Sequence, residues 1–172
     1  MHRIKIPDAT SLPRLSEKRL RGWFAIRWPG NQSKWPIQLA SQVEDYLNAN
    51  AAFLQADAVA FIHSDLTRDH LLGRLENGHW ETGAVIDFGD AQVGNIFYEL
   101  AALHLDLFDA DRRLLRAFLQ AYGLPPGPDF TRQAMVTSLM HQFDVYGPLF
   151  EKLELRRIRT LDELAECLWQ VN

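Results

Sequence analysis

Apolar and polar positions follow three different patterns along this chain, and each pattern predicts a different kind of structure. Up to residue 36, prolines and the turn-like stretch WPGNQSKWP interrupt any period, so we expect loops with one short helix at about 16–27 that Ser16 could cap. From Pro36 to about Ala56 apolar residues recur at helical spacing, and a proline suits a first helical turn. This stretch predicts a helix whose apolar face holds Ile37, Leu39, Ala40, Val43, Tyr46, Leu47 and Phe53.

The middle of the chain has the short apolar runs that are typical of strands. AVAFIH at 58–63 predicts a buried strand or the approach to a loop. Two further runs, at 70–76 and 79–88, flank Asn77-Gly78, and Asn-Gly between strand-like runs is the strongest short hairpin signal. Because a hairpin brings the outer ends of its two strands together, residues at those ends are expected to share one site.

The last part of the chain is predicted to be helical. We expect helices at 96–108, 110–123, 129–155 and 160–171, the third either unbroken or divided at Gly147-Pro148. Gly123 is a typical residue for the end of the second helix. Thr160 stands three residues before Glu163, which is the pattern of a capping box at the start of the fourth.

Length and composition narrow the class of protein. A chain of 172 residues with 47% apolar and 23% charged residues is typical of one soluble globular domain. It has no apolar run long enough to cross a bilayer, so no membrane partner is expected. Its one cysteine, Cys167, excludes an intrachain disulfide and a cysteine-based zinc site. These features favour a cytoplasmic protein.

The net charge of −4 conceals an asymmetry. Residues 1–35 hold eight Lys or Arg against two acidic residues, a net charge of +6, which leaves −10 for residues 36–172. We therefore divide the chain into a basic, proline-containing N-terminal arm (1–35) and a helical domain (36–172). A basic arm can bind nucleic acid or an acidic neighbour. Because it carries no nucleic-acid motif, we favour a solvated leader and do not expect a nucleic-acid partner.

The candidate chemistry lies in two segments, HSDLTRDH at 63–70 and DFG at 87–89. The catalytic loop of protein kinases has the sequence H-R-D-x-x-x-x-N, and D-F-G stands at the end of the following hairpin. Here His70 stands at the spacing of that Asn after Asp65. Phosphoryl transfer needs a base for the acceptor hydroxyl and ligands that hold magnesium on the phosphates. Two motifs in this order, with a hairpin between them, are far more specific than either alone.

These residues resemble the aminoglycoside phosphotransferases and their kin, including choline and homoserine kinases. Family members carry blocks like H-G-D-x-x-x-x-N, I-D-F-G-D and G-x-x-x-Y-D-L-A, where this chain reads HSDLTRDH and VIDFGDAQVGNIFYELA. The resemblance covers residues 56–108 in detail, and the His70-Leu71-Leu72 context is closest to the 2″-aminoglycoside phosphotransferase branch. It implies the C-terminal lobe of a protein-kinase-like fold: mostly α with a small β-hairpin, an α+β class.

The resemblance also implies a role for each residue. Asp65 would be the catalytic base, and His63, its catalytic partner, would orient the loop. Asp87 would hold Mg²⁺ against the phosphates of ATP or GTP, with His70 as a further metal ligand. Glu99 stands where the family usually has a buried Asp that braces the catalytic loop. The implied reaction moves the γ-phosphate to the hydroxyl of a small molecule.

Each of these residues also has a purely structural interpretation. Asp65 and Asp87 could be turn or cap residues, and His70 could be a strand histidine, because imidazole is an uncommon ligand of Mg²⁺. His63 is more often structural than catalytic. Asn95 also departs from the Asp that the family often has there.

The nucleotide-binding lobe of such a kinase is expected to be missing. Only 62 residues precede His63, and they contain no glycine-rich loop; Lys5 is the one lysine in a strand-like context. An exposed apolar surface near Phe61, Ile62 and Leu72 is therefore expected, which favours a partner chain carrying that lobe or a homo-oligomer. The alternatives are a non-catalytic lobe that binds a ligand or partner, half of a split kinase, or an adaptor that uses the basic arm.

Overall fold

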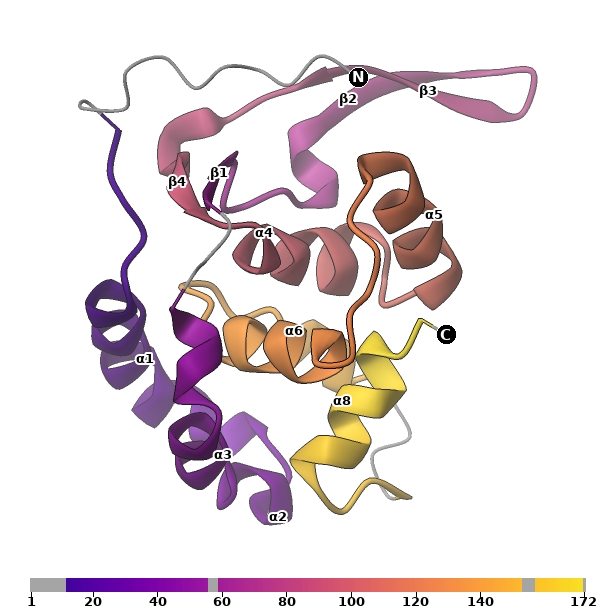
Figure 1. The fold of residues 1–172 in the computed structure, drawn as a ribbon. Helices are drawn as coiled ribbons and strands as arrows, with labels where there is room; N and C mark the ends of the chain where they lie inside the picture. Colours follow the sequence, from indigo (N-terminus) through magenta and orange to yellow (C-terminus); the bar gives the residue numbers. More distant parts are fainter. Residues whose placement is uncertain (1–11, 56–58, 153–156, 172) are drawn as a thin grey trace.

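The computed structural model describes residues 12–55, 59–152 and 157–171, which form a mostly helical structure with two small antiparallel sheets (Figure 1). The helices are α1 (Glu17–Asn31), α2 (Ile37–Ala40), α3 (Val43–Ala49), α4 (Ile96–Ala102), α5 (Arg112–Tyr122), α6 (Phe130–Leu139), α7 (Gly147–Phe150) and α8 (Leu161–Trp169). The strands are β1 (Val59–Ile62), β2 (Leu71–Glu76), β3 (His79–Val85) and β4 (Gln92–Asn95). Short 3-10 helices are η1 (Gln32–Lys34), η2 (Ala51–Leu54), η3 (Arg68–His70) and η4 (Phe88–Asp90), and η5 (Leu103–Leu107) is a π-helix. The predicted mix of helices and a small hairpin is confirmed.

Strands β1 and β4 form the first sheet, which lies above and to the left of α4 in Figure 1. The register pairs Val59 with Asn95, Ala60 with Gly94, Phe61 with Val93 and Ile62 with Gln92. The segment that leads into α1 adds to this sheet, because Leu15 N donates to Val93 O at 2.8 Å. A Cβ at Gly94 would lie 2.8 Å from Leu15 Cβ, so a glycine allows this close approach.

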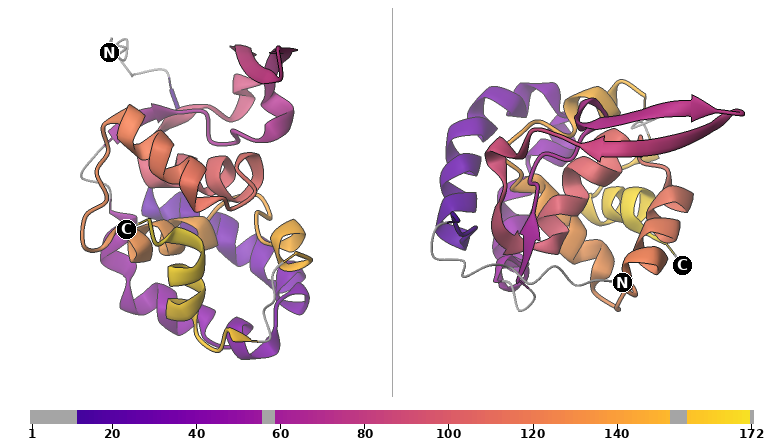
Figure 2. Two further views of the ribbon diagram at one scale, coloured as in Figure 1. Left: turned by 90° about the vertical axis from the view of Figure 1, so that its right-hand side faces the viewer. Right: turned by 90° about the horizontal axis from the view of Figure 1, so that it is seen from above.

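The second sheet is the predicted hairpin of β2 and β3. Asn77 and Gly78 have φ angles of 50° and 80°, the left-handed pair that a two-residue type I′ turn requires. A bulge follows Leu72, and the Trp80 ring covers Gly73 so closely that a Cβ there would lie 2.5 Å from Trp80 Cζ2. Both strands are exposed and extend away from the helices (Figure 2). The hairpin therefore depends on its own turn and cross-strand contacts.

Helices α4 and α6 form the centre of the core. Every residue of α4 is buried, and α4 packs against α6 and β1, while α6 packs against α8 and η2. Asn95 caps α4, because its Oδ1 accepts a hydrogen bond from Phe97 N at 3.0 Å. The Asn95 position that departs from the family pattern thus begins the central helix.

The helices predicted near the end of the chain are confirmed where their signals are local. Helix α5 ends at Gly123, whose φ of 78° is the left-handed conformation of a C-cap glycine. Thr160 and Glu163 form the reciprocal hydrogen bonds of a capping box at the start of α8. The expected helix at 96–108 is α4 continued by the π-helix η5.

Two predictions in the first 56 residues are wrong in extent. Helix α1 does not end near residue 27 but continues through Pro29 to Asn31, and buried Trp28 in its last turn stacks on Phe24. The expected helix at 36–56 is instead divided into α2, α3 and η2. Ser41 and Asn50 make side-chain hydrogen bonds to backbone carbonyls at the breaks, which compete with a continuous helix. Ile37, which was expected on the apolar face, is exposed at the start of α2.

The helix expected at 129–155 is also shorter than predicted. Helix α6 ends at Leu139, whose carbonyl oxygen accepts a hydrogen bond from Arg27 Nη2 at 2.7 Å. The Asp144 carboxylate then accepts hydrogen bonds from Tyr146 N and Gly147 N, which starts the separate helix α7. The break therefore lies at residues 140–146, before the Gly147-Pro148 pair. Residues 153–156 lie outside the described part of the chain.

The apolar surface beside β1 matches the expectation at two of its three residues. Phe61 and Leu72 are 40% and 49% exposed, but Ile62 is 1% exposed. Successive side chains of a strand point to opposite faces, so Ile62 faces the core when Phe61 faces out.

Leu20, Trp28 and Trp35 join the same core as the later helices, so the described part of residues 1–35 packs on the domain. The boundary at residue 35 stays a prediction, and Lys5 lies outside the described residues. Within the described ranges, no helix has the length and apolar character needed to cross a membrane.

Candidate functional site

The base of the hairpin brings the four predicted site residues together. His70, at the end of η3, lies between two carboxylates: its Nδ1 is 3.8 Å from Asp65 Oδ2, and its Nε2 is 3.7 Å from Asp87 Oδ2. His63 lies behind it, with ring centroids 5.5 Å apart. The hairpin thus places two acidic residues that are 22 positions apart on the two sides of one imidazole, as the strand pairing predicts.

Hydrogen bonding fixes the tautomer of His70. Its Nδ1 lies 2.6 Å from the backbone oxygen of Asp65 and 3.2 Å from Thr67 Oγ1. A carbonyl oxygen can only accept, so Nδ1 carries the proton and donates it there. Nε2 then presents its lone pair on the side of Asp87, which is the arrangement of a metal-binding histidine whose other nitrogen is held by a backbone carbonyl.

His63 connects the two motifs. Its Nε2 donates to the backbone oxygen of Ile86 at 2.7 Å, and its ring packs 4.7 Å from that of Phe88. In the part of the chain that the structure describes, its buried Nδ1 has no hydrogen-bond partner. This geometry orients the loop against the residue that precedes Asp87.

The two acidic residues have different surroundings. The Asp65 side chain is 22% exposed, and burial raises the pKa of its carboxyl group, while nearby His70 acts in the opposite direction. The Asp87 side chain is 66% exposed, and its backbone is left-handed, with φ 60° and ψ 62°. A non-glycine residue in this conformation is held by its surroundings and is common at functional sites.

Ser64, between His63 and Asp65, is completely buried, and each of its three polar atoms has a side-chain partner. Ser64 N donates to Glu99 Oε2 at 2.7 Å, Gln92 Nε2 donates to Ser64 Oγ at 2.9 Å, and His141 Nε2 donates to Ser64 O at 3.1 Å. Burial raises the pKa of the Glu99 carboxyl, and the bond from Ser64 partly offsets this. Glu99 thus holds the backbone of the loop at Ser64.

Sequence reasoning missed Gln92 and His141. Gln92 lies in a four-residue strand with every residue buried, so no alternation marks it. His141 is 77 positions from Ser64, in a turn that was expected to be helical. Neither residue stands in a recognisable motif.

The π-helix η5 holds the other end of the loop formed by residues 63–70. Asp106 Oδ1 accepts hydrogen bonds from Arg68 N at 3.1 Å and Arg68 Nε at 3.2 Å. Arg68 Nη2 also donates to the backbone oxygen of Asp106 at 2.6 Å. A π-turn widens the helix locally and often occurs beside functional sites; here it presents Asp106 to η3.

The residues at this site fit part of a magnesium ligand set. Magnesium is usually held by one or two carboxylates together with phosphate oxygens and waters. Asp87 offers an exposed carboxylate and His70 a free lone pair on Nε2. Within residues 12–55, 59–152 and 157–171, no three His, Cys, Asp or Glu side chains form a ready cation cluster. The remaining ligands would therefore have to come from phosphate and water.

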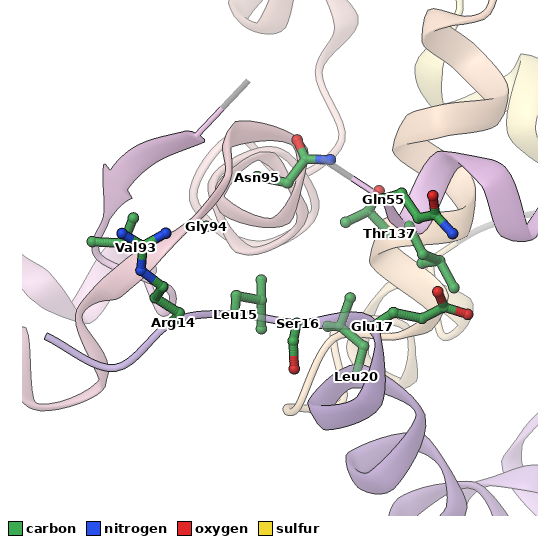
Figure 3. Close-up of a pocket in the computed structure, with 11 residues that line it drawn as sticks. Arg14, Leu15, Ser16, Glu17, Leu20, Gln55, Val93, Gly94, Asn95 and Thr137 are labelled. Carbon is green, nitrogen blue, oxygen red and sulfur yellow. The ribbon is translucent and has the colours of Figure 1, made fainter. Parts of the chain in front are cut away.

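A pocket of about 180 Å³ lies elsewhere, between the start of α1 and β4 (Figure 3). It is lined by Arg14, Leu15, Ser16, Glu17, Leu20, Leu54, Gln55, Val93, Gly94, Asn95 and Thr137. Its lining includes neither of the candidate carboxylates, so we place the candidate chemistry at the hairpin base.

Comparison with known proteins supports the family resemblance. The model of the phosphotransferase enzyme family, APH, matches residues 1–134. Lysine-specific demethylase JMJ21 of Arabidopsis thaliana is 24% identical over 140 residues, an alignment that covers 64% of this chain and 15% of that protein. The chain thus corresponds to a small part of the curated relative that it matches. Since the family model covers well over half of the chain, the chain belongs to the phosphotransferase enzyme family.

Proposed function

We propose that this chain is a phosphotransferase domain of the aminoglycoside and choline kinase type, which transfers the γ-phosphate of ATP or GTP to a hydroxyl of a small molecule. The observation that supports it most is the position of His70 between the Asp65 and Asp87 carboxylates, 3.8 and 3.7 Å away. Membership of the phosphotransferase enzyme family makes phosphoryl transfer the expected chemistry.

Each residue has a separate task in this proposal. The Asp65 carboxylate accepts the proton of the acceptor hydroxyl, and its partly buried position keeps that proton transfer away from bulk water. Asp87 and His70 Nε2 hold Mg²⁺, which neutralises charge on the nucleotide phosphates. His63 keeps Ile86 and the start of η4 against the loop, so that the base and the metal ligands stay together.

We further propose that these residues form the C-terminal lobe of a kinase-like fold, nearest to the 2″-aminoglycoside phosphotransferase branch, and that a second lobe covers the phosphates. Two of the lysines are committed elsewhere, Lys34 to Asp144 at 3.1 Å and Lys152 to Asp109. With one side of the nucleotide in contact, binding should be weak, at about millimolar strength, because several charge-assisted contacts of about 1.5–3 kcal/mol are lacking. A partner chain or a second copy would then complete the site.

NMR titration of the chain with Mg²⁺-ATP and Mg²⁺-GTP tests the metal and nucleotide roles. We expect the signals of His70 and of the residues around Asp87 to shift on titration, and Asp87→Ala to remove these shifts. Asp65→Ala should keep them, because Asp65 acts on the acceptor. Asp45→Ala, a change at an exposed aspartate of α3, is the matched control and should bind as the wild type does.

Turnover separates the two acids. In the assembly that completes the site, phosphorus NMR follows transfer to choline and to an aminoglycoside as trial acceptors, and Asp65→Ala should remove transfer without weakening nucleotide binding. His70→Asn should retain both properties, because asparagine is the residue of the family pattern at this position. Nucleotide binding by Asp87→Ala equal to that of the wild type would refute the proposed metal site.

A further inference from the structure

Helix α1, which the sequence suggests is part of a solvated basic arm, carries two arginines that bond to β4 and to the end of α6. Arg19 Nη1 donates to Gln92 Oε1 at 3.2 Å, and the Arg19 guanidinium lies 4.7 Å over the Trp23 ring. Two turns further on, Arg27 Nη2 donates to the backbone oxygen of Leu139 at 2.7 Å. Figure 3 shows the start of α1 beside β4, the strand that begins with Gln92.

Gln92 connects Arg19 to Ser64. The amide of this buried residue accepts from Arg19 through Oε1 and donates to Ser64 Oγ through Nε2, at 2.9 Å. An arginine can only donate, so its contact fixes which end of the amide is oxygen and leaves the NH₂ group facing Ser64. The orientation of Gln92, and with it the hydrogen bond to the Ser64 hydroxyl, therefore depends on Arg19.

His141 makes the second connection. Arg27 holds the last carbonyl of α6, two residues before His141. The buried His141 ring stacks on Tyr98 at 4.4 Å, accepts from Phe143 N through Nδ1 and donates through Nε2 to Ser64 O. Burial lowers the pKa of His141 to about 4, so the ring is neutral at pH 7 and keeps one proton on Nε2 for this bond.

Both connections end on Ser64, which is under backbone strain. Ser64 has a φ of 72°, a conformation that costs a residue with a Cβ about 1–2 kcal/mol and persists only where neighbours impose it. Asp65 follows directly, so the position of its carboxylate depends on how Ser64 is held.

We propose that Gln92 and His141 are positioning residues of the catalytic loop, and that helix α1 sets both of them through Arg19 and Arg27. The inference rests on the proposed function for the role of Asp65. It gives the basic N-terminal segment a task in the site without any direct contact to a substrate.

Amide hydrogen exchange of the full chain tests this proposal without requiring turnover. The Ser64 amide, which donates to buried Glu99, should exchange roughly 5–10-fold faster in both Gln92→Met and Arg19→Met. Gln92→Met removes a hydrogen bond to the Ser64 hydroxyl, and Arg19→Met releases the Gln92 amide that makes this bond. His141→Phe keeps the ring stack and should have the same effect. The comparison is the amide of Val136, in the middle of α6, which reports opening of the core.

Two further variants separate positioning from general stability. Arg21→Met removes the same charge from the same helix, but Arg21 pairs with Glu17 at 2.8 Å, so the Ser64 amide should be unchanged. Arg19→Lys retains a donor for Gln92 and should restore slow exchange at Ser64. Equal acceleration of amide exchange at Ser64 and Val136, or no acceleration at either, would overturn the proposal. If the variants at buried Gln92 or His141 do not fold, Arg19→Met still decides the question.

Turnover provides a separate readout. In the phosphotransfer assay, Gln92→Met should lower kcat by a larger factor than it changes the KM for nucleotide, since Ser64 directly precedes the base Asp65, whereas the metal ligand Asp87 lies beyond the other strand of the hairpin. A wild-type chain that binds no nucleotide would refute the proposed function, whereas the exchange rates at Ser64 would still decide whether α1 holds the loop.

Discussion

Replacement of Ser64 by alanine and by glycine separates two free-energy terms that this residue carries. Both changes remove the hydroxyl that accepts from Gln92 Nε2 at 2.9 Å, and both keep the backbone bonds to Glu99 and His141. Only glycine also removes the Cβ from a residue whose φ is 72°. The difference between the two variants therefore isolates the strain.

The magnitudes follow from burial and conformation. Loss of the hydroxyl leaves the buried Gln92 amide without an acceptor, so Ser64→Ala should lower the free energy of unfolding by about 1–3 kcal/mol. Removal of the Cβ recovers about 1–2 kcal/mol of strain. The greater conformational entropy of glycine in the unfolded chain offsets about 0.4–1 kcal/mol of this gain. Ser64→Gly should thus be more stable than Ser64→Ala by about 1 kcal/mol.

Urea unfolding of the wild type and the two variants, followed by circular dichroism, measures this difference as a change in midpoint at constant slope. The assay also bears on the family pattern, which has glycine at this position. An alanine variant as stable as the glycine variant would refute the reasoning, because it would mean that Ser64 is not held in the left-handed conformation.

Three more perturbations test separate features. The pKa of Glu99 is raised above its ordinary value of 4.5 in the folded state, so the folded chain binds more protons than the unfolded chain. Stability should therefore fall as the pH rises through the folded-state pKa. Glu99→Gln should flatten this part of the plot of urea midpoint against pH. Gly73→Ala should push apart the facing backbone oxygen of Glu81 and the Trp80 ring, destabilise the hairpin by about 1–3 kcal/mol and move the indole NH signal of Trp80, whereas Gly83→Ala, with only an ordinary 3.7 Å contact to Leu72 O, should not. Thr160→Ala should remove the capping box of α8 and lower the free energy of unfolding by about 1 kcal/mol, measured as a fall in Tm of about 2–4 °C.

Features with a local cause were predictable from the sequence. The hairpin follows from Asn77-Gly78, whose two left-handed residues leave few alternatives, and the start of α8 follows from Thr160 and Glu163. The order of the two motifs, with the hairpin between them, was enough to group Asp65, His70 and Asp87. These features are determined by residues close together in the chain, so they can be predicted from one sequence.

Features that depend on distant contacts were not predictable in the same way. The end of α6 is set by Arg27, 112 positions earlier, and the turn after it presents His141 to Ser64. Helix α1 continues through Pro29 because Trp28 stacks on Phe24 and meets the Trp35 ring edge to face in the core, which outweighs the usual effect of a proline. Helical spacing alone could not reveal either arrangement.

The three side chains that bond to Ser64 determine how late in folding the loop of residues 63–70 reaches its final conformation. They come from positions 28, 35 and 77 residues further along the chain, so each bond closes a loop whose entropy must be offset before the bond contributes. Contacts of such separation form slowly compared with a helix or a hairpin turn. The hairpin can therefore exist while Ser64 is still relaxed, and the loop becomes ordered only when β4, α4 and the end of α6 have assembled. A nascent or partly unfolded chain would carry the two acidic residues without the geometry that relates them, so the proposed phosphoryl transfer would be confined to chains that have completed folding.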